Sequence, residues 1–220
     1  MRRLVALSTK QQGLVTRAQL LACGRTERQI DYALVAEHLR YVHLGVYRVA
    51  GSAVGEDGAL AAGLLLTEGV ASHRSAAQLL GLVESRPTSP EISVGPTQTH
   101  RKTDLILHRS RDLASADICR IRGLRCTTAT RTLVDLGAVV SPAVLESALE
   151  RALHQRMTTV PRLQKRLEQV ARPGRPGVKA LRRVPDLRTP RLAAAESELE
   201  LLLWQILRRH RLPVPQYGSS

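Results

Sequence analysis

Two helix-start signals stand close together near the N-terminus and leave room for only a short turn between two helices. Each is a threonine with a glutamine three residues later, the spacing of a capping box: Thr16–Gln19 and Thr26–Gln29. Gly24 lies between them and can adopt the positive φ angle that ends a helix. We therefore expect helices over 17–23 and about 27–37 in a helix-turn-helix layout.

The residues after the second helix alternate in the manner of two strands. Segments 39–43 and 46–49 flank Leu44-Gly45, which predicts a β-hairpin directly after the helix pair. A helix-turn-helix followed by a hairpin is a winged helix-turn-helix, whose second helix enters the major groove of DNA. This module is predicted to span residues 1–52.

The beginning of the second helix is predicted to contact base edges, because glutamine pairs with adenine and arginine with guanine. These residues are Thr26, Glu27, Arg28, Gln29, Asp31 and Tyr32. The residues predicted to complete the DNA interface, mainly at phosphates, are Arg17, Arg25, Arg40, His43, Tyr47 and Arg48. The alternative is a helix pair used only for protein contacts, and the acidic Glu27 and Asp31 count against a strong phosphate grip.

The charge of the chain points to a polyanionic partner such as double-stranded DNA. The formal net charge is +14, from 33 basic and 19 acidic side chains. Codon usage is an alternative cause, since the chain has 29 Arg, 4 Lys and neither Phe nor Asn. The charge is nevertheless polarised: residues 1–55 hold 8 basic and 3 acidic side chains, 56–140 hold 10 and 9, and 141–220 hold 15 and 7.

Several classes of protein are excluded by what the sequence lacks. No apolar run approaches the roughly 20 residues of a membrane helix, and the polar start gives no signal peptide, so we expect a cytoplasmic protein with no membrane partner. Cys23, Cys119 and Cys126 form no CxxC pair, so neither a disulfide framework nor a zinc site is predicted.

Short helical and strand-like segments alternate in the middle of the chain. They predict a small α/β domain with C-terminal helices over 56–171, including a single strand near 121–126 and a helix over 128–139. The segment Ser72-His73-Arg74-Ser75 is interpreted as a helix start capped by Ser72, and His108-Arg109-Ser110-Arg111 as a strand end with solvated arginines. A phosphate clamp at the second segment is the alternative.

No phosphate-binding loop, GxSxG or HExxH motif occurs, so no catalytic residue, metal ligand or cofactor is predicted. The chain is therefore expected not to be an enzyme.

Several motifs resemble those of the AbiEi-family antitoxins of type IV toxin–antitoxin systems. They cover about residues 8–156 and are, in order, Gln12-Gly13-Leu14-Val15-Thr16-Arg17-Ala18-Gln19-Leu20, His43-Leu44-Gly45-Val46-Tyr47, Ser72-His73-Arg74-Ser75-Ala76-Ala77, His108-Arg109-Ser110-Arg111 and Arg131-Thr132-Leu133-Val134-Asp135-Leu136. The resemblance implies a DNA-binding regulator that represses its own operon and neutralises a cognate toxin. Relatives often continue into an endonuclease-like domain similar to very-short-patch-repair nucleases.

The C-terminal third is predicted to be helical and partly unpartnered. Helices are expected over 142–156, 160–170 and 178–184, with a basic linker and the short helix over 172–190. Residues 191–210 form an amphipathic pattern. The motifs Ser197-Glu198-Leu199-Glu200 and Leu212-Pro213-Val214-Pro215 resemble the opening helix of the endonuclease-like domain, so 191–220 is interpreted as a truncated domain. Its leucine-rich face predicts a homodimer or aggregation where nothing covers it. The whole chain is thus expected to be α+β.

Two other functions stay open at this point. One is a nuclease whose missing part lies in a longer reading frame or another chain, because only Glu196, Glu198 and Glu200 offer carboxylates near the end. The other is a protein-interaction module that neutralises a toxin through residues 56–171, with DNA binding secondary.

Overall fold

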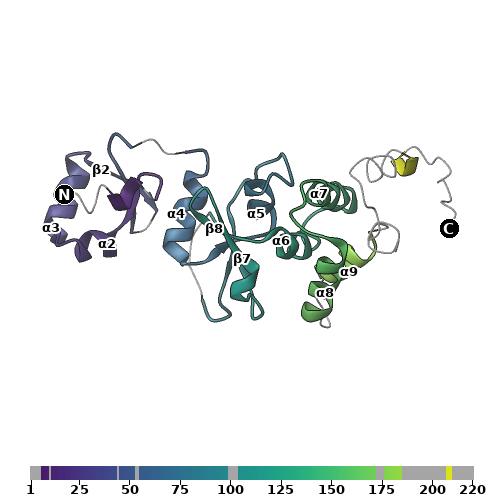
Figure 1. Ribbon diagram of the computed structural model, residues 1–220. Coiled ribbons are helices and arrows are strands. Elements are labelled where there is room, and N and C mark those ends of the chain that lie inside the picture. The colour runs from purple at the N-terminus through teal and green to yellow at the C-terminus, as the bar shows by residue number, and fades with distance from the viewer. Residues whose placement is uncertain are drawn as a thin grey trace, which may run out of the picture. The chain divides into compact units, whose positions relative to one another are not determined.

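The computed structural model describes residues 6–9, 11–43, 45–52, 55–98, 104–171, 176–184 and 207–209 (Figure 1). They form a mixed α+β structure with a three-stranded and a five-stranded sheet. The chain divides into an N-terminal unit, Met1–Thr132, and a C-terminal unit, Leu133–Ser220, so the division lies within the predicted segment 56–171. No helix in these residues is both long and apolar enough to cross a membrane.

The first 50 residues of the N-terminal unit include two capped helices and an antiparallel sheet of order β1-β3-β2. Its elements are β1 (Leu14–Thr16), α2 (Arg17–Ala22), α3 (Glu27–Val35), β2 (Leu39–His43) and β3 (Val46–Val49). Both predicted capping boxes are present: the backbone N–H of Gln19 donates to the Thr16 hydroxyl at 3.1 Å, and that of Gln29 to Thr26 at 3.2 Å. The predicted helices and hairpin are confirmed, although α3 ends two residues before the predicted limit.

Strand β1 was not predicted. It contains only three residues, too few to show an alternating pattern, and its Leu14 and Val15 are both fully buried. Gly13, at φ 79°, directs the chain into the strand, which pairs with β3. A strand this short is therefore recognised from its pairing with β3 and not from its own sequence.

The three-stranded sheet is covered on both faces. One face packs on the helix pair, with a core made of Val15, Leu20, Ile30, Leu39 and Tyr47. The other face packs on α4 (Gly58–Thr67), and Leu14 and Val46 join Leu60 and Ala61 in the larger core. The helix pair is therefore anchored to the rest of the unit through a shared sheet.

The second sheet has the order β6-β5-β4-β8-β7. Its strands are β4 (Val70–Ala71), β5 (Glu91–Val94), β6 (Ile106–Arg109), β7 (Ile118–Ile121) and β8 (Leu124–Thr127), and α5 (His73–Leu79) follows β4 directly. The β5–β6 and β4–β8 pairs are parallel, whereas β4–β5 and β7–β8 are antiparallel. The sheet is therefore mixed, and the turn from β4 into α5 lies beside β5.

The single strand predicted near 121–126 was wrong, because this segment is the turn and second strand of a hairpin. Arg122 and Gly123 have φ values of 49° and 82°, which is the geometry of a type I′ turn between β7 and β8. The turn pairs Cys119 with Cys126, whose sulfur atoms lie 3.4 Å apart as free thiols. Arg-Gly lacks the Asn or Asp that usually signals such a turn, so the sequence did not reveal it.

The described residues of the C-terminal unit include the helices α7 (Pro142–His154), α8 (Val160–Val170) and α9 (Pro176–Arg182). The hydroxyls of Ser141 and Thr159 cap the first two, which confirms both predicted helices. The third begins at Pro176, inside the predicted linker, because proline is tolerated at the first helical position. The predicted endonuclease-like helix and Glu196, Glu198 and Glu200 lie outside the described residues, of which 207–209 are helical.

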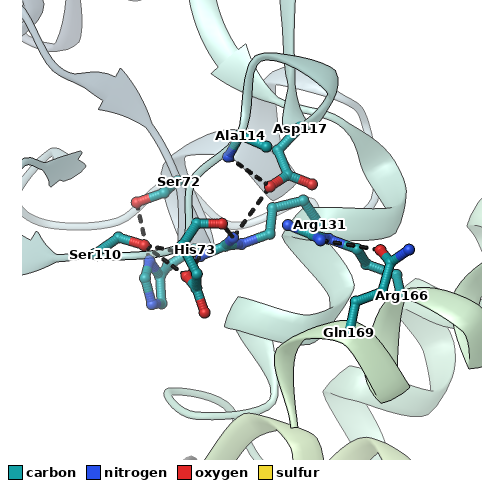
Figure 2. Close-up of polar contacts among 9 residues, drawn as sticks. Ser72, His73, Ser110, Ala114, Asp117, Arg131, Arg166 and Gln169 are labelled. Atoms are coloured by element: carbon teal, nitrogen blue, oxygen red, sulfur yellow. Dashed lines mark hydrogen bonds and ion pairs between the residues drawn. The ribbon is translucent and has the colours of Figure 1, made fainter.

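A buried arginine connects the end of the second sheet to α6 (Ala129–Leu136). Arg131 is 2% exposed, and its guanidinium donates to the carboxylates of Asp117 at 3.2 Å and Asp112 at 3.1 Å. It also donates to the Asp112 carbonyl and to the Ser110 hydroxyl, both at 3.1 Å (Figure 2). The loop after β6 is thus held by one side chain.

Replacing Arg131 with methionine is expected to lower the free energy of unfolding by about 3–5 kcal/mol, because it removes the cation beside a buried carboxylate. Arg120→Ala is the control: that exposed arginine donates to the Gly123 carbonyl in the turn after β7, and its loss should change stability by less than about 0.5 kcal/mol. Urea denaturation followed by circular dichroism measures both. Equal losses in the two variants would contradict the role of the Arg131 contacts.

Candidate functional site

The first half of α3 carries an exposed polar surface. The side chains that the sequence predicts at base edges are all exposed: Thr26, Glu27, Arg28, Gln29, Asp31 and Tyr32. Ile30, on the opposite side of the helix, is 1% exposed and fixes α3 on the sheet. The helix is therefore amphipathic, and its outer face is accessible to a partner.

Arg17 links the two helices and the hairpin. Its guanidinium donates to Glu27 at 2.7 Å, to Asp31 at 3.2 Å and to the Tyr47 hydroxyl at 3.2 Å, while its backbone N–H donates to the Gly45 carbonyl at 2.8 Å. Hydrogen bonds to Glu27, Tyr47 and Asp31 raise the pKa of Arg17 above its ordinary value. Arg17 therefore positions α3 and offsets the two acidic charges on its outer face.

Two predicted phosphate contacts of the hairpin lie on the other face of the sheet from α3. Arg40 and Arg48 are directly paired across β2 and β3, so their side chains share a face. Leu14 pairs with Arg48 on that same face, and it belongs to the core against α4. Arg40 is exposed and contacts Glu37 at 3.3 Å, whereas Arg48 is half-buried.

The remaining predicted interface residues differ in accessibility. Arg25 and His43 are half-buried. Tyr47 is 5% exposed and lies in the core between the sheet and the helix pair, where its hydroxyl accepts from Arg17. Tyr47 is therefore placed as a packing residue, because a ligand at the surface cannot reach it.

A second cluster brings together two histidines that are far apart in the sequence. His73, at the start of α5, stacks on His108 of β6 with ring centroids 3.5 Å apart and ring planes at 16°. Glu91 of β5 is 1% exposed, and its Oε2 lies 3.4 Å from Nε2 of His108. The cluster forms because β5 and β6 pair in register and α5 begins beside β5.

Glu91 is held as a carboxylate inside the protein. Burial raises the pKa of Glu91, but the contacts with His108 and Arg74 outweigh it and hold the pKa at about 2. Arg74 supplies both its guanidinium, 2.7 Å from Oε1, and its backbone N–H, 3.1 Å from Oε2. A buried charge held beside two imidazoles makes this cluster a candidate functional site.

The turn into α5 is built differently from the predicted helix start. Ser72 occupies the N-cap position, but its side chain makes no capping hydrogen bond and instead shares one of 2.9 Å with Nδ1 of His73 (Figure 2). His73 has a φ of 50°, in the left-handed region, which is uncommon for a residue other than glycine. The prediction of a capping side chain at Ser72 was therefore wrong.

No protein-family model matches the chain, and no curated protein matches it either. The resemblance to AbiEi-family antitoxins therefore stays a prediction from the motifs. The sequence did not indicate the histidine cluster, because its three residues come from three separate elements, α5, β5 and β6. Alternation on β5, which puts Glu91 and Ser93 on one face, is the signal that could have indicated it.

Replacing Thr26 with alanine is expected to lower the free energy of unfolding by about 1 kcal/mol, because it removes the side-chain cap of α3. Thr26→Ser keeps a hydroxyl at the same place and should retain most of that stability. Chemical denaturation of the two variants measures the difference. If Thr26→Ser lowers the free energy of unfolding as much as Thr26→Ala does, the Thr26 hydroxyl does not stabilise the protein by capping α3.

Proposed function

We propose that the chain is a DNA-binding transcriptional regulator whose N-terminal segment is a winged helix-turn-helix. The observation that carries this function is the exposed polar face of α3, which begins at a capping box and is anchored by Ile30 to a sheet. An exposed helix at the end of such a helix pair is the element that reads the major groove in this class of protein.

The side chains on this face have the chemistry needed for base contacts. Arg28 and Gln29 are exposed in the first turn of α3, where a recognition helix meets base edges. The ion pairs with Arg17 offset the repulsion that Glu27 and Asp31 would exert on phosphates. In this proposal Arg17 is a positioning residue, in place of the phosphate contact predicted from the sequence.

The sheet supplies a second basic surface. Arg40 and Arg48 are directly opposite on neighbouring strands, an arrangement in which like charges repel unless an anion offsets them. The Glu37 carboxylate, 3.3 Å from Arg40, supplies one such anion, and the phosphate groups of a duplex would supply another. These arginines lie on the face of the sheet away from α3, so in this proposal any phosphate contact that they make is separate from the base contacts of α3.

The antitoxin part of the proposal rests on the motifs over residues 8–156 alone. In that proposal the chain represses its own operon through α3 and neutralises a toxin through the segment that follows. The described residues contain no observation that favours the nuclease, whose candidate carboxylates lie outside them.

Arg28→Ala is expected to weaken binding to a duplex from the region upstream of the chain's own coding sequence by about 5- to 150-fold. That range corresponds to the roughly 1–3 kcal/mol of one arginine–guanine contact. Binding to a random duplex should change much less. Fluorescence anisotropy with both duplexes at one fixed salt concentration measures the two affinities.

Arg120→Ala is the matched control, because it removes the same charge from an exposed position on β7. It should leave the ratio of the two affinities unchanged. Equal losses on both duplexes for Arg28→Ala would contradict sequence reading by α3, and no binding to either duplex by the unaltered chain would overturn the DNA-binding function itself.

A further inference from the structure

We propose that His73, Glu91 and His108 form a binding site for a divalent transition-metal ion, and that Zn²⁺ fits it. One ligand atom of each residue lies within 4.8 Å of the ligand atoms of the other two. Two imidazoles and a carboxylate are a donor set found at zinc sites that keep an open coordination position. This site is separate from the proposed DNA interface on α3.

The separation of the ligand atoms is close to what a zinc ion needs. Zinc binds nitrogen and oxygen at about 2.0–2.2 Å, so the ligands of a tetrahedral ion lie about 3.4 Å apart. Nε2 of His108 and Oε2 of Glu91 already lie at 3.4 Å, although no hydrogen bond joins them. Within the described part of the chain this buried Nε2 has no hydrogen-bond partner, so a metal ion would supply the one it lacks.

Groups around the cluster would hold the ligands in place, as outer-shell partners do at metal sites. Nδ1 of His73 lies 2.9 Å from the Ser72 hydroxyl, and this contact helps to fix the orientation of the ring. The Ser75 hydroxyl accepts from the Glu91 backbone N–H at 2.8 Å and fixes the strand. Ser72 and Ser75 both lie where the chain enters α5, so the fold itself places these supporting groups beside the cluster.

Arg74 does not block the carboxylate. It uses one position on each oxygen of Glu91, at 2.7 and 3.1 Å, and an ionised carboxylate has about four acceptor positions. Arginine also offsets part of the negative charge, so the site favours a metal that binds mainly through imidazole nitrogen over Ca²⁺ or Mg²⁺, which prefer several oxygens.

The rings must turn slightly before they bind. The ring planes of His73 and His108 are nearly parallel, at 16°, with centroids 3.5 Å apart, so one ion cannot lie in the planes of both rings at once. Rotation of one ring about its Cβ–Cγ bond brings its nitrogen toward Glu91. His108 is 23% exposed at its side chain, which gives an ion a route to the site.

The test is a Zn²⁺ titration of the full chain after removal of metals with a chelator, followed by calorimetry. We expect one ion per chain, and His108→Gln should weaken that binding by at least about 100-fold, because even outer-shell changes cost 10- to 100-fold. His38→Gln is the matched control, since His38 is exposed and lies outside the cluster, and it should bind as the unaltered chain does. Binding as tight in His108→Gln as in His38→Gln would overturn the site.

Thermal unfolding separates loss of a ligand from loss of the fold. At 100 times the dissociation constant, Zn²⁺ should raise the Tm of the unaltered chain by about 5 °C or more, and that of His108→Gln by less than about 1 °C. Both metal-free proteins should unfold cooperatively. Co²⁺ should also give visible absorption bands that His108→Gln lacks, and their absence in the unaltered chain would contradict the proposal.

Discussion

The three-stranded sheet β1-β3-β2 has apolar side chains on both faces, and the N-terminal unit depends on covering them both. One face is buried by α2 and α3, and the other joins α4 and the core of the second sheet. Because successive strand residues point to opposite faces, Leu14 and Val15 each commit β1 to a different core. The sheet therefore leaves the outer face of α3 as the surface through which this helix can meet a partner.

Contacts of two arginine side chains join elements of the fold in addition to the apolar packing. Arg17 joins α2, α3 and the hairpin in one set of contacts, and Arg131 does the same for the loop after β6. The His73–Glu91–His108 cluster is different, because it includes a residue with a left-handed backbone and a buried nitrogen that has no hydrogen-bond partner among the described residues. Such costs are typical of sites that act on a ligand.

Local signals in the sequence were enough for the parts of the fold that depend on neighbours along the chain. The capping boxes at Thr16 and Thr26 located both helices, and alternation located β2 and β3. Pairing between distant segments was not predictable: β1 was missed, β7 and β8 were read as one strand, and Glu91 was not connected with His108. The contacts of Arg17 with Glu27 and Tyr47, and the burial of Tyr47, also depend on segments far apart in the sequence, so residue type alone did not indicate them.

Hydrogen exchange on the full chain tests the central claim, that α3 is the surface which meets DNA. The chain is compared alone and with a duplex from the region upstream of its own coding sequence, at low salt. The account predicts slower exchange in α3 (Glu27–Val35) and in the β2–β3 hairpin, with no change in β7 and β8. Slower exchange confined to other segments, with α3 unchanged in a complex that has formed, would contradict it.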